Sequence, residues 1–182
     1  QVFAFCEDVA ASGGYWLACA ADEIFADENS IIGSIGVISA SFGFDQFIAR
    51  QGIERRIFTS GEEKSTLDPF LPSDPEDIQR LKRIQKSIHS NFINHVERSR
   101  GEKIGTNKIF NGEFWDAGKA LELGLIDGIG HLEPILKSKF GNDIEFKFLS
   151  RKKSFFSRFS RSAANAFFEG IMNKSFFSRF GL

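Results

Sequence analysis

The sequence predicts an α/β domain in which short buried strands alternate with helices. An apolar run at residues 2–6 is typical of a buried strand, and the apolar stretch 15–21, which follows two glycines, predicts a helix. Residues 78–96 then place apolar side chains at spacings of three and four, as in an amphipathic helix. Because strands and helices alternate, we expect helices packed on a largely parallel sheet.

The other elements follow from shorter apolar runs and from the Gly, Pro and Asp residues between them. We expect strands at 22–26, 53–58, 113–115, 125–127 and 144–149, helices at 44–51, 116–124 and 132–140, a turn at 7–12 and a loop at 59–72. The stretch 30–38 is rich in β-forming residues, and its glycines indicate a close backbone approach. Ser73 and Glu76 predict a capping box for the long helix, with Pro75 in its first turn.

Composition and charge indicate a folded domain followed by a basic tail. The chain has 182 residues, of which 42% are hydrophobic and 26% charged, as in globular proteins. Residues 150–182 contain seven Lys/Arg and one Glu, a charge of +6, so the net charge of -1 leaves -7 for residues 1–149. We therefore expect a folded domain over 1–149 and a separate tail over 150–182.

The tail holds eight of the 22 phenylalanines of the chain. The heptapeptide Lys153-Ser-Phe-Phe-Ser-Arg-Phe159 recurs unchanged over residues 174–180. A helix with this pattern has an aromatic face and a basic face, which suits an anionic membrane surface. Docking on the protein's own body and disorder are the alternatives. No run of 18 apolar residues occurs, so the sequence predicts no transmembrane helix.

The chain begins at Gln1 directly in an apolar run, without Met. We interpret it as the C-terminal portion of a larger domain whose N-terminal part lies upstream. Cys6 and Cys19 lie in apolar settings without metal-ligand spacing, so we interpret them as buried thiols. We expect no metal, no cofactor and no nucleic-acid partner.

Ser12 is the candidate nucleophile. It lies in Asp8-Val-Ala-Ala-Ser12-Gly-Gly-Tyr15, between a predicted strand and a predicted helix. A sharp turn there exposes the hydroxyl, and the N–H groups at a helix start favour negative charge. Gly13 leaves its own N–H open to a developing oxyanion. The competing interpretation is a helix N-cap, a position where serine is common.

A serine nucleophile needs a base, and the histidines do not supply one convincingly. His89 and His95 lie six residues apart on the long helix, and His131 begins another, so we interpret all three as surface or packing residues. Lys64 can act if its amine is held neutral, which burial of a lysine favours. Its competing interpretation is a solvated lysine in a loop.

Four motifs in one order connect these residues. They are the Ser12 motif, Gly33-Ser-Ile-Gly-Val37, Ser60-Gly-Glu-Glu-Lys64, and a late block over 111–128 that contains Gly124-Leu-Ile-Asp127. Lys64 follows Ser12 by 52 residues. The set resembles the signal peptide peptidase family (SppA and its SohB relatives) over residues 2–140, and the tail lies outside the resemblance.

The resemblance implies a ClpP/crotonase-like fold, a spiral of βα units, and a serine endopeptidase that cleaves membrane-derived peptides such as remnant signal peptides. It implies Ser12 as nucleophile, Lys64 as general base and, less directly, Ser34 as the hydroxyl that orients the lysine amine. Gly13 would donate one oxyanion N–H. The glycine loop that supplies the family's second donor would precede Gln1.

The resemblance also implies a homo-oligomer in which neighbouring subunits share each Ser–Lys site, and a membrane-associated protein of the bacterial cell envelope. Two alternatives keep the fold but not the reaction. A crotonase-like acyl-CoA enzyme would have no need of Lys64. A catalytically inactive membrane scaffold would need neither residue, and the presence of both Ser12 and Lys64 argues against it.

Overall fold

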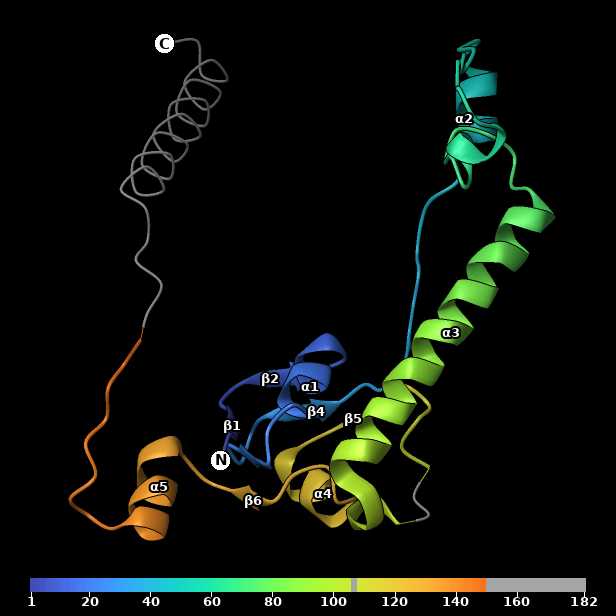
Figure 1. Cartoon of the computed structure of the whole chain (residues 1–182). Coiled ribbons are helices and arrows are strands. Elements are labelled where there is room, and N and C mark those ends of the chain that lie inside the picture. The colour runs from blue at the N-terminus through green and yellow to red at the C-terminus, as the bar shows by residue number, and fades with distance from the viewer. Residues whose placement is uncertain (106–107, 150–182) are drawn as a thin grey trace, which may run out of the picture. The chain divides into compact units, whose positions relative to one another are not determined.

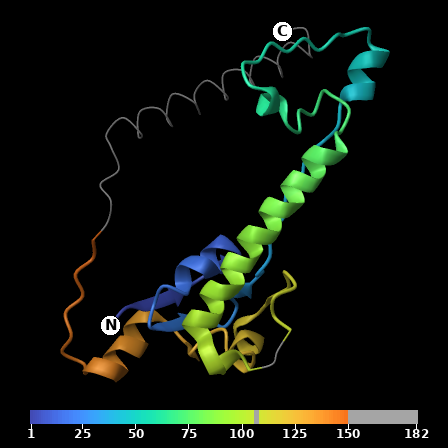
Figure 2. The same cartoon turned by 45° about the vertical axis from the view of Figure 1, so that its right-hand side comes forward.

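A computed structural model describes residues 1–105 and 108–149 of the chain (Figures 1 and 2). Residues Gln1–Asn142 form one compact unit. The chain from Asp143 onward belongs to a second unit, of which 143–149 are described. The predicted tail, residues 150–182, lies outside the described residues. No helix within the described ranges is long and apolar enough to cross a membrane.

Two small sheets form the centre of the first unit, and both contain parallel strands. One sheet has the order β1 (Phe3–Cys6), β3 (Glu23–Ala26), β6 (Gly128–Ile129), all parallel. The other has the order β2 (Val9–Ala11), β4 (Ile31–Gly33), β5 (Phe114–Trp115), with β2 and β4 parallel and β5 antiparallel to β4. We expected a turn over residues 7–12, and this prediction is wrong for Val9–Ala11, which form β2.

The chain passes from the first sheet to the second and then through α1 (Gly13–Ala18) before it returns. Each such turn adds one strand to each sheet, because β1 and β2 precede α1 while β3 and β4 follow it. This repeated path is a spiral of βα units, and the fold is the ClpP/crotonase-like α/β class that the sequence predicts.

The remaining helices largely follow the predicted ranges. They are α2 (Asp45–Arg50), α3 (Pro75–Arg100), α4 (Ala117–Glu122) and α5 (Leu132–Phe140), with short 3-10 turns η1 (Glu62–Ser65) and η2 (Gly101–Ile104). The cap of α3 differs from the prediction: its N-cap is Asp74, whose carboxylate accepts the Glu76 N–H at 2.7 Å, not Ser73. Pro75 occupies the first turn, as expected.

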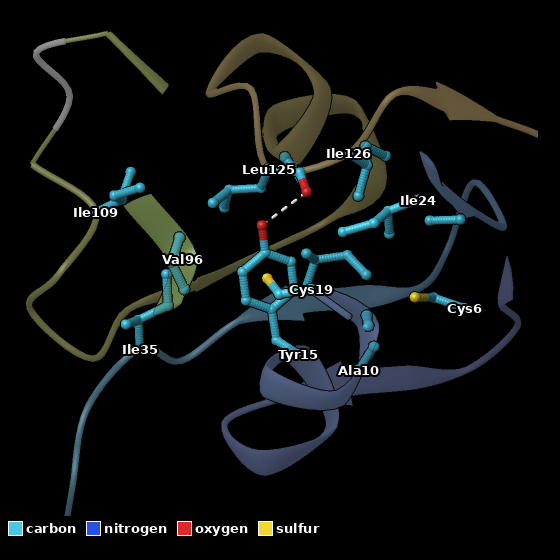
Figure 3. Packing of buried hydrophobic residues seen from close by; sticks show 14 of the residues in the cluster. Cys6, Ala10, Tyr15, Cys19, Ile24, Ile35, Val96, Ile109, Leu125 and Ile126 are labelled. Atoms are coloured by element: carbon cyan, nitrogen blue, oxygen red, sulfur yellow. Dashed lines mark hydrogen bonds between the residues drawn. The ribbon is translucent and has the colours of Figure 1, made fainter. Parts of the chain in front are cut away.

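The core lies where α1, the C-terminal part of α3 and residues 125–126 meet (Figure 3). Tyr15 is fully buried there, and its hydroxyl donates a hydrogen bond to the Leu125 carbonyl at 2.7 Å. Ile35 and Val96 pack in the same cluster. Because these contacts join segments far apart in the sequence, α1 is held firmly although it is only six residues long.

Only the C-terminal part of α3 is buried. Phe92 and Val96 lie in the core, whereas Ile84 and Ile88 are about half exposed, at 52% and 45%. Residues 41–72, which we call the tip segment, contact the beginning of α3, where the Leu67 N–H donates to Asp77 at 3.2 Å. Figures 1 and 2 both show α2, part of the tip segment, at the N-terminal end of α3.

Three predicted strands are wrong in whole or in part. Residues 53–58 form no strand, because they lie on the tip segment without a neighbouring strand, and Phe58 is 94% exposed. Residues 144–149 likewise form none. The strand expected at 125–127 begins only at Gly128, since the Leu125 N–H still bonds to Ala120 in the turn that ends α4.

Candidate active site

Ser12 and Ser34 lie side by side at the carboxyl ends of two parallel strands. β2 and β4 are paired so that Ala11 lies opposite Gly33, and each serine is the next residue of its strand. The Ser12 N–H donates to the Gly33 carbonyl at 2.8 Å. The sheet register therefore brings together two predicted site residues that are 22 positions apart in the sequence.

Both serines have a backbone that L-amino acids rarely adopt. Ser12 and Ser34 each have a φ of 52°, in the left-handed region where glycine is favoured. Such conformations cost about 1–3 kcal/mol each and occur mainly at functional sites, where the surrounding structure holds them. At Ser12 the strain belongs to a tight turn from strand β2 to helix α1.

The hydroxyl of Ser12 is not used as a helix cap. Ser12 occupies the N-cap position of α1, but its side chain makes no capping hydrogen bond, and the residue is exposed. Ser12 thus stands at the N-cap position, but its hydroxyl is not engaged in capping. Gly13 follows at the first helical position, where a backbone N–H has no partner within the helix.

Two backbone hydrogen bonds hold Ser34 in place. Its N–H donates to the Glu113 carbonyl at 2.7 Å, and its carbonyl accepts the Gly36 N–H at 2.9 Å. The preceding glycine is required: Gly33 has a φ of 106°, and a Cβ there would lie 2.8 Å from the indole ring of Trp115. The Gly-Ser pair of the motif is therefore explained by close packing.

An apolar pocket of about 270 Å³ opens beside Ser12. It is lined by Ser12, Gly13, Trp16, Gly36, Val37, Ile38, Ile88 and Phe92. These residues come from α1, α3 and the segment that follows β4. A larger polar cavity of about 350 Å³ lies on the tip segment, but Ser12 does not line it.

Lys64 lies on the tip segment and not beside Ser12. It is exposed in η1, and its neighbour Glu63 pairs with Arg80 near the beginning of α3. The Ser12 pocket instead touches Phe92, and α3 rises about 1.5 Å per residue, so Arg80 and Phe92 are about 18 Å apart along the helix. Within one chain, the structure does not bring Lys64 to Ser12.

The two histidines of α3 make contacts that sequence reasoning missed. His89 Nε2 lies 3.2 Å from the Ile35 carbonyl, and His95 Nε2 lies 3.0 Å from the Trp16 carbonyl. No hydrogen bond described in residues 1–105 and 108–149 joins either imidazole to Ser12. No sequence pattern could have shown these bonds, because their acceptors are backbone atoms more than 50 residues away.

The described ranges contain no group of three or more His, Cys, Asp or Glu side chains able to hold a metal ion. Cys6 and Cys19 are buried free thiols, and burial raises the pKa of both. A thiol in such surroundings is a poor nucleophile, because the thiolate is the reactive form.

Comparison with known proteins gives several relatives. A Brucella abortus protein named Na(+)/H(+) antiporter NhaA is 48% identical over 87% of this chain, but the match spans 22% of that protein. A signal peptide peptidase SppA of Enterococcus faecium is 31% identical over 72% of this chain and 39% of its own length. A protease SohB of Buchnera aphidicola is 30% identical over 93% of this chain and 50% of its own length.

The chain thus spans about half, or less, of the proteins that it matches. A solved enoyl-CoA hydratase/isomerase family member aligns over 70% of this chain with 20% identity and a TM-score of 0.29, too low to add to the assignment. The model of peptidase family S49 matches residues 1–140, which include all four motifs. The chain belongs to peptidase family S49, the family of the SppA and SohB signal peptide peptidases.

Proposed function

We propose that this chain is the catalytic part of a serine endopeptidase in which Ser12 is the nucleophile and Lys64 the general base. The observation that carries the proposal is the exposed Ser12, strained at a strand–helix turn, beside Ser34 and an apolar pocket. Membership of a peptidase family supports the same reaction.

Lys64 is exposed in the single chain, so this proposal requires that assembly bury it and favour its neutral amine. That amine accepts the Ser12 hydroxyl proton as Oγ attacks the peptide carbonyl. The Gly13 N–H stabilises the oxyanion that forms, and Ser34 orients the lysine amine. The lysine then gives its proton to the leaving amine. Water, deprotonated by the same lysine, hydrolyses the acyl-enzyme and restores the serine hydroxyl.

We further propose that Lys64 acts on Ser12 of a neighbouring copy in a homo-oligomer. The support is the position of Lys64 near the beginning of α3, about three turns of helix from the Ser12 pocket. Exposed apolar residues lie on both regions, with Ile38 88% exposed beside Ser12 and Phe42 78% exposed on the tip segment. Burial of such residues is the usual driving force of a protein interface.

The substrates in this proposal are apolar peptides derived from membrane proteins, such as remnant signal peptides. The pocket beside Ser12 supports this, because Val37, Ile38 and Phe92 offer only apolar contacts to a substrate side chain. Enough room exists for a single aliphatic side chain, since the pocket measures about 270 Å³.

We also propose that residues 150–182 hold the enzyme against an anionic membrane surface of the bacterial cell envelope. Their charge of +6 and eight phenylalanines support this, since each basic residue near anionic lipid contributes about 1 kcal/mol. Co-sedimentation with anionic vesicles tests it: removal of 150–182 should abolish binding, and equal binding by the truncated chain would contradict it.

Hydrolysis of a fluorogenic apolar peptide, together with labelling by a serine-directed fluorophosphonate, tests the proposed dyad. Ser12→Ala and Lys64→Ala should each abolish cleavage, and the double variant should lose no more, because the two residues act as one unit. Ser12→Ala should also abolish labelling. The matched control is Lys147→Ala, an exposed lysine outside the first unit, which should keep wild-type rates.

Cleavage by Lys64→Ala within tenfold of wild type would remove Lys64 from the mechanism. A folded wild-type protein that neither labels nor cleaves would point to the inactive scaffold. Labelling without peptide cleavage would leave the acyl-CoA enzyme as the candidate to examine.

A further inference from the structure

The elements that carry the two serines are short. β2 and β4 have three residues each, and α1 has six. Elements of this size gain little stability of their own, because most of the stability of a helix or strand comes from packing. Both serines nevertheless keep a strained backbone, so contacts beyond these short elements must help to hold them in place.

His95 makes the first contact that fixes this region. Trp16 lies one turn after Ser12, and its N–H donates to the Ser12 carbonyl at 3.0 Å. The carbonyl of the same Trp16 accepts from His95 Nε2 at 3.0 Å, and the imidazole stacks on the indole at 5.3 Å. The backbone of Ser12 is thus connected to α3 by two successive hydrogen bonds.

His89, nearly two turns earlier on the same helix, makes the second contact. Its Nε2 lies 3.2 Å from the carbonyl of Ile35, the residue directly after Ser34. Ile35 is fully buried, so this carbonyl has little access to water. Because a carbonyl oxygen can only accept, both imidazoles must carry a proton on Nε2.

We propose that His89 and His95 are positioning residues that fix Ser34 and Ser12 relative to one another. The β2/β4 register brings the two serines together, and one rigid helix then donates a hydrogen bond to the backbone near each of them, which limits changes in the separation of the two hydroxyls. A displacement of about 1 Å at a reacting group can reduce the rate about a hundredfold. The inference rests on the proposed peptidase function, since it assigns the pair a role in that reaction.

Paired substitutions in the full chain separate the hydrogen bond from packing. His89→Phe and His95→Phe keep a ring but remove the donor, whereas His89→Gln and His95→Gln restore an N–H at a similar reach. We expect the Phe variants to lose about 10- to 100-fold in kcat with KM within about threefold, and the Gln variants to recover most of it. The matched control is His131→Phe, whose exposed imidazole faces Asp27 at 3.4 Å and should have wild-type kinetics.

Wild-type kcat in both Phe variants, or equal losses in the Phe and Gln variants, would overturn the positioning role. A readout independent of activity covers the case of Phe variants that do not fold. Nitrogen-15 NMR of the wild-type chain labelled at histidine should show neutral His89 and His95 protonated at Nε2, and an Nδ1–H form of either would refute the proposed bonds. If the wild type shows the expected tautomers but cleaves no peptide, the proposed function fails and not the geometry.

Discussion

Ser12 combines an exposed side chain with a backbone that would suit glycine, with φ 52° and ψ -118°. A side chain at positive φ brings Cβ close to the backbone, and the resulting strain of about 1–3 kcal/mol is stored in the folded state. Because glycine has no Cβ, it can adopt this conformation without that strain.

Two substitutions at this position separate strain from catalysis. We expect Ser12→Gly and Ser12→Ala to be equally inactive, but Ser12→Gly to have the larger free energy of unfolding, by about 1 kcal/mol after the greater chain entropy of glycine is deducted. Urea denaturation of the two variants measures the difference. Equal stability, or a more stable Ala variant, would show that the turn relaxes when the hydroxyl is removed.

At the scale of elements, an ion pair between the buried Arg100 and the partly buried Asp127 joins α3 to the turn that follows α4. Arg100 is 2% exposed and donates to both oxygens of Asp127, at 2.8 and 3.0 Å, and to the Gly124 carbonyl at 2.9 Å. Asp127 also accepts from the Ile24 N–H and from Lys103. Burial alone would raise the pKa of Asp127, but the hydrogen bonds from Arg100 and Lys103 outweigh it and hold the pKa well below its usual range.

We expect Asp127→Asn to destabilise the fold by about 3–5 kcal/mol, because Arg100 would stay buried without its counter-ion. The control is Lys103→Met, which removes a half-exposed partner of the same carboxylate and should cost at most about 1 kcal/mol. Urea denaturation at neutral pH compares the two variants. Similar losses in both would contradict a dominant role for the Arg100–Asp127 pair.

The Asp127 carboxylate also makes the free energy of unfolding depend on pH. The folded-state pKa of Asp127 lies below its unfolded value of about 3.9, so its contribution is complete above that pH and is lost as the pH falls further. Urea denaturation from pH 6 down to pH 3 should therefore show a steeper loss in wild type than in Asp127→Asn. Parallel curves would contradict this linkage.

At the scale of the whole molecule, the separation of Lys64 from Ser12, taken with the proposed dyad, predicts that activity depends on assembly. If each site combines Ser12 of one copy with Lys64 of another, dilution to monomers should abolish cleavage even though both residues are present. Mixed oligomers of Ser12→Ala and Lys64→Ala chains should regain cleavage at a fraction of the sites, because some sites then receive both intact residues.

Size-exclusion chromatography with light scattering must first establish that the two variants co-assemble. The peptide assay on the mixture then decides the matter, with each variant alone as the control. Absence of recovery in verified mixed oligomers would place Ser12 and Lys64 of each site in one subunit, after a movement of the tip segment.

Local patterns predicted much of the fold. The spacing of apolar residues located α3, and short apolar runs located β1, α1 and β3. The same reasoning was wrong for residues 53–58, which have no partner strand, and it missed β2, whose three residues are too few for a periodic pattern. A strand exists only when a neighbour satisfies its backbone, and no local pattern contains that information.

The sequence by itself determined the identity of the candidate residues: a serine before two glycines, a lysine 52 positions later, and four motifs in family order. Only the tertiary structure placed Ser34 beside Ser12, Lys64 at the other end of α3, and two imidazoles on the backbone near both serines. The reason is physical. Side-chain chemistry and local propensity are properties of a residue and its neighbours, whereas these distances follow from strand register and from the direction of one long helix.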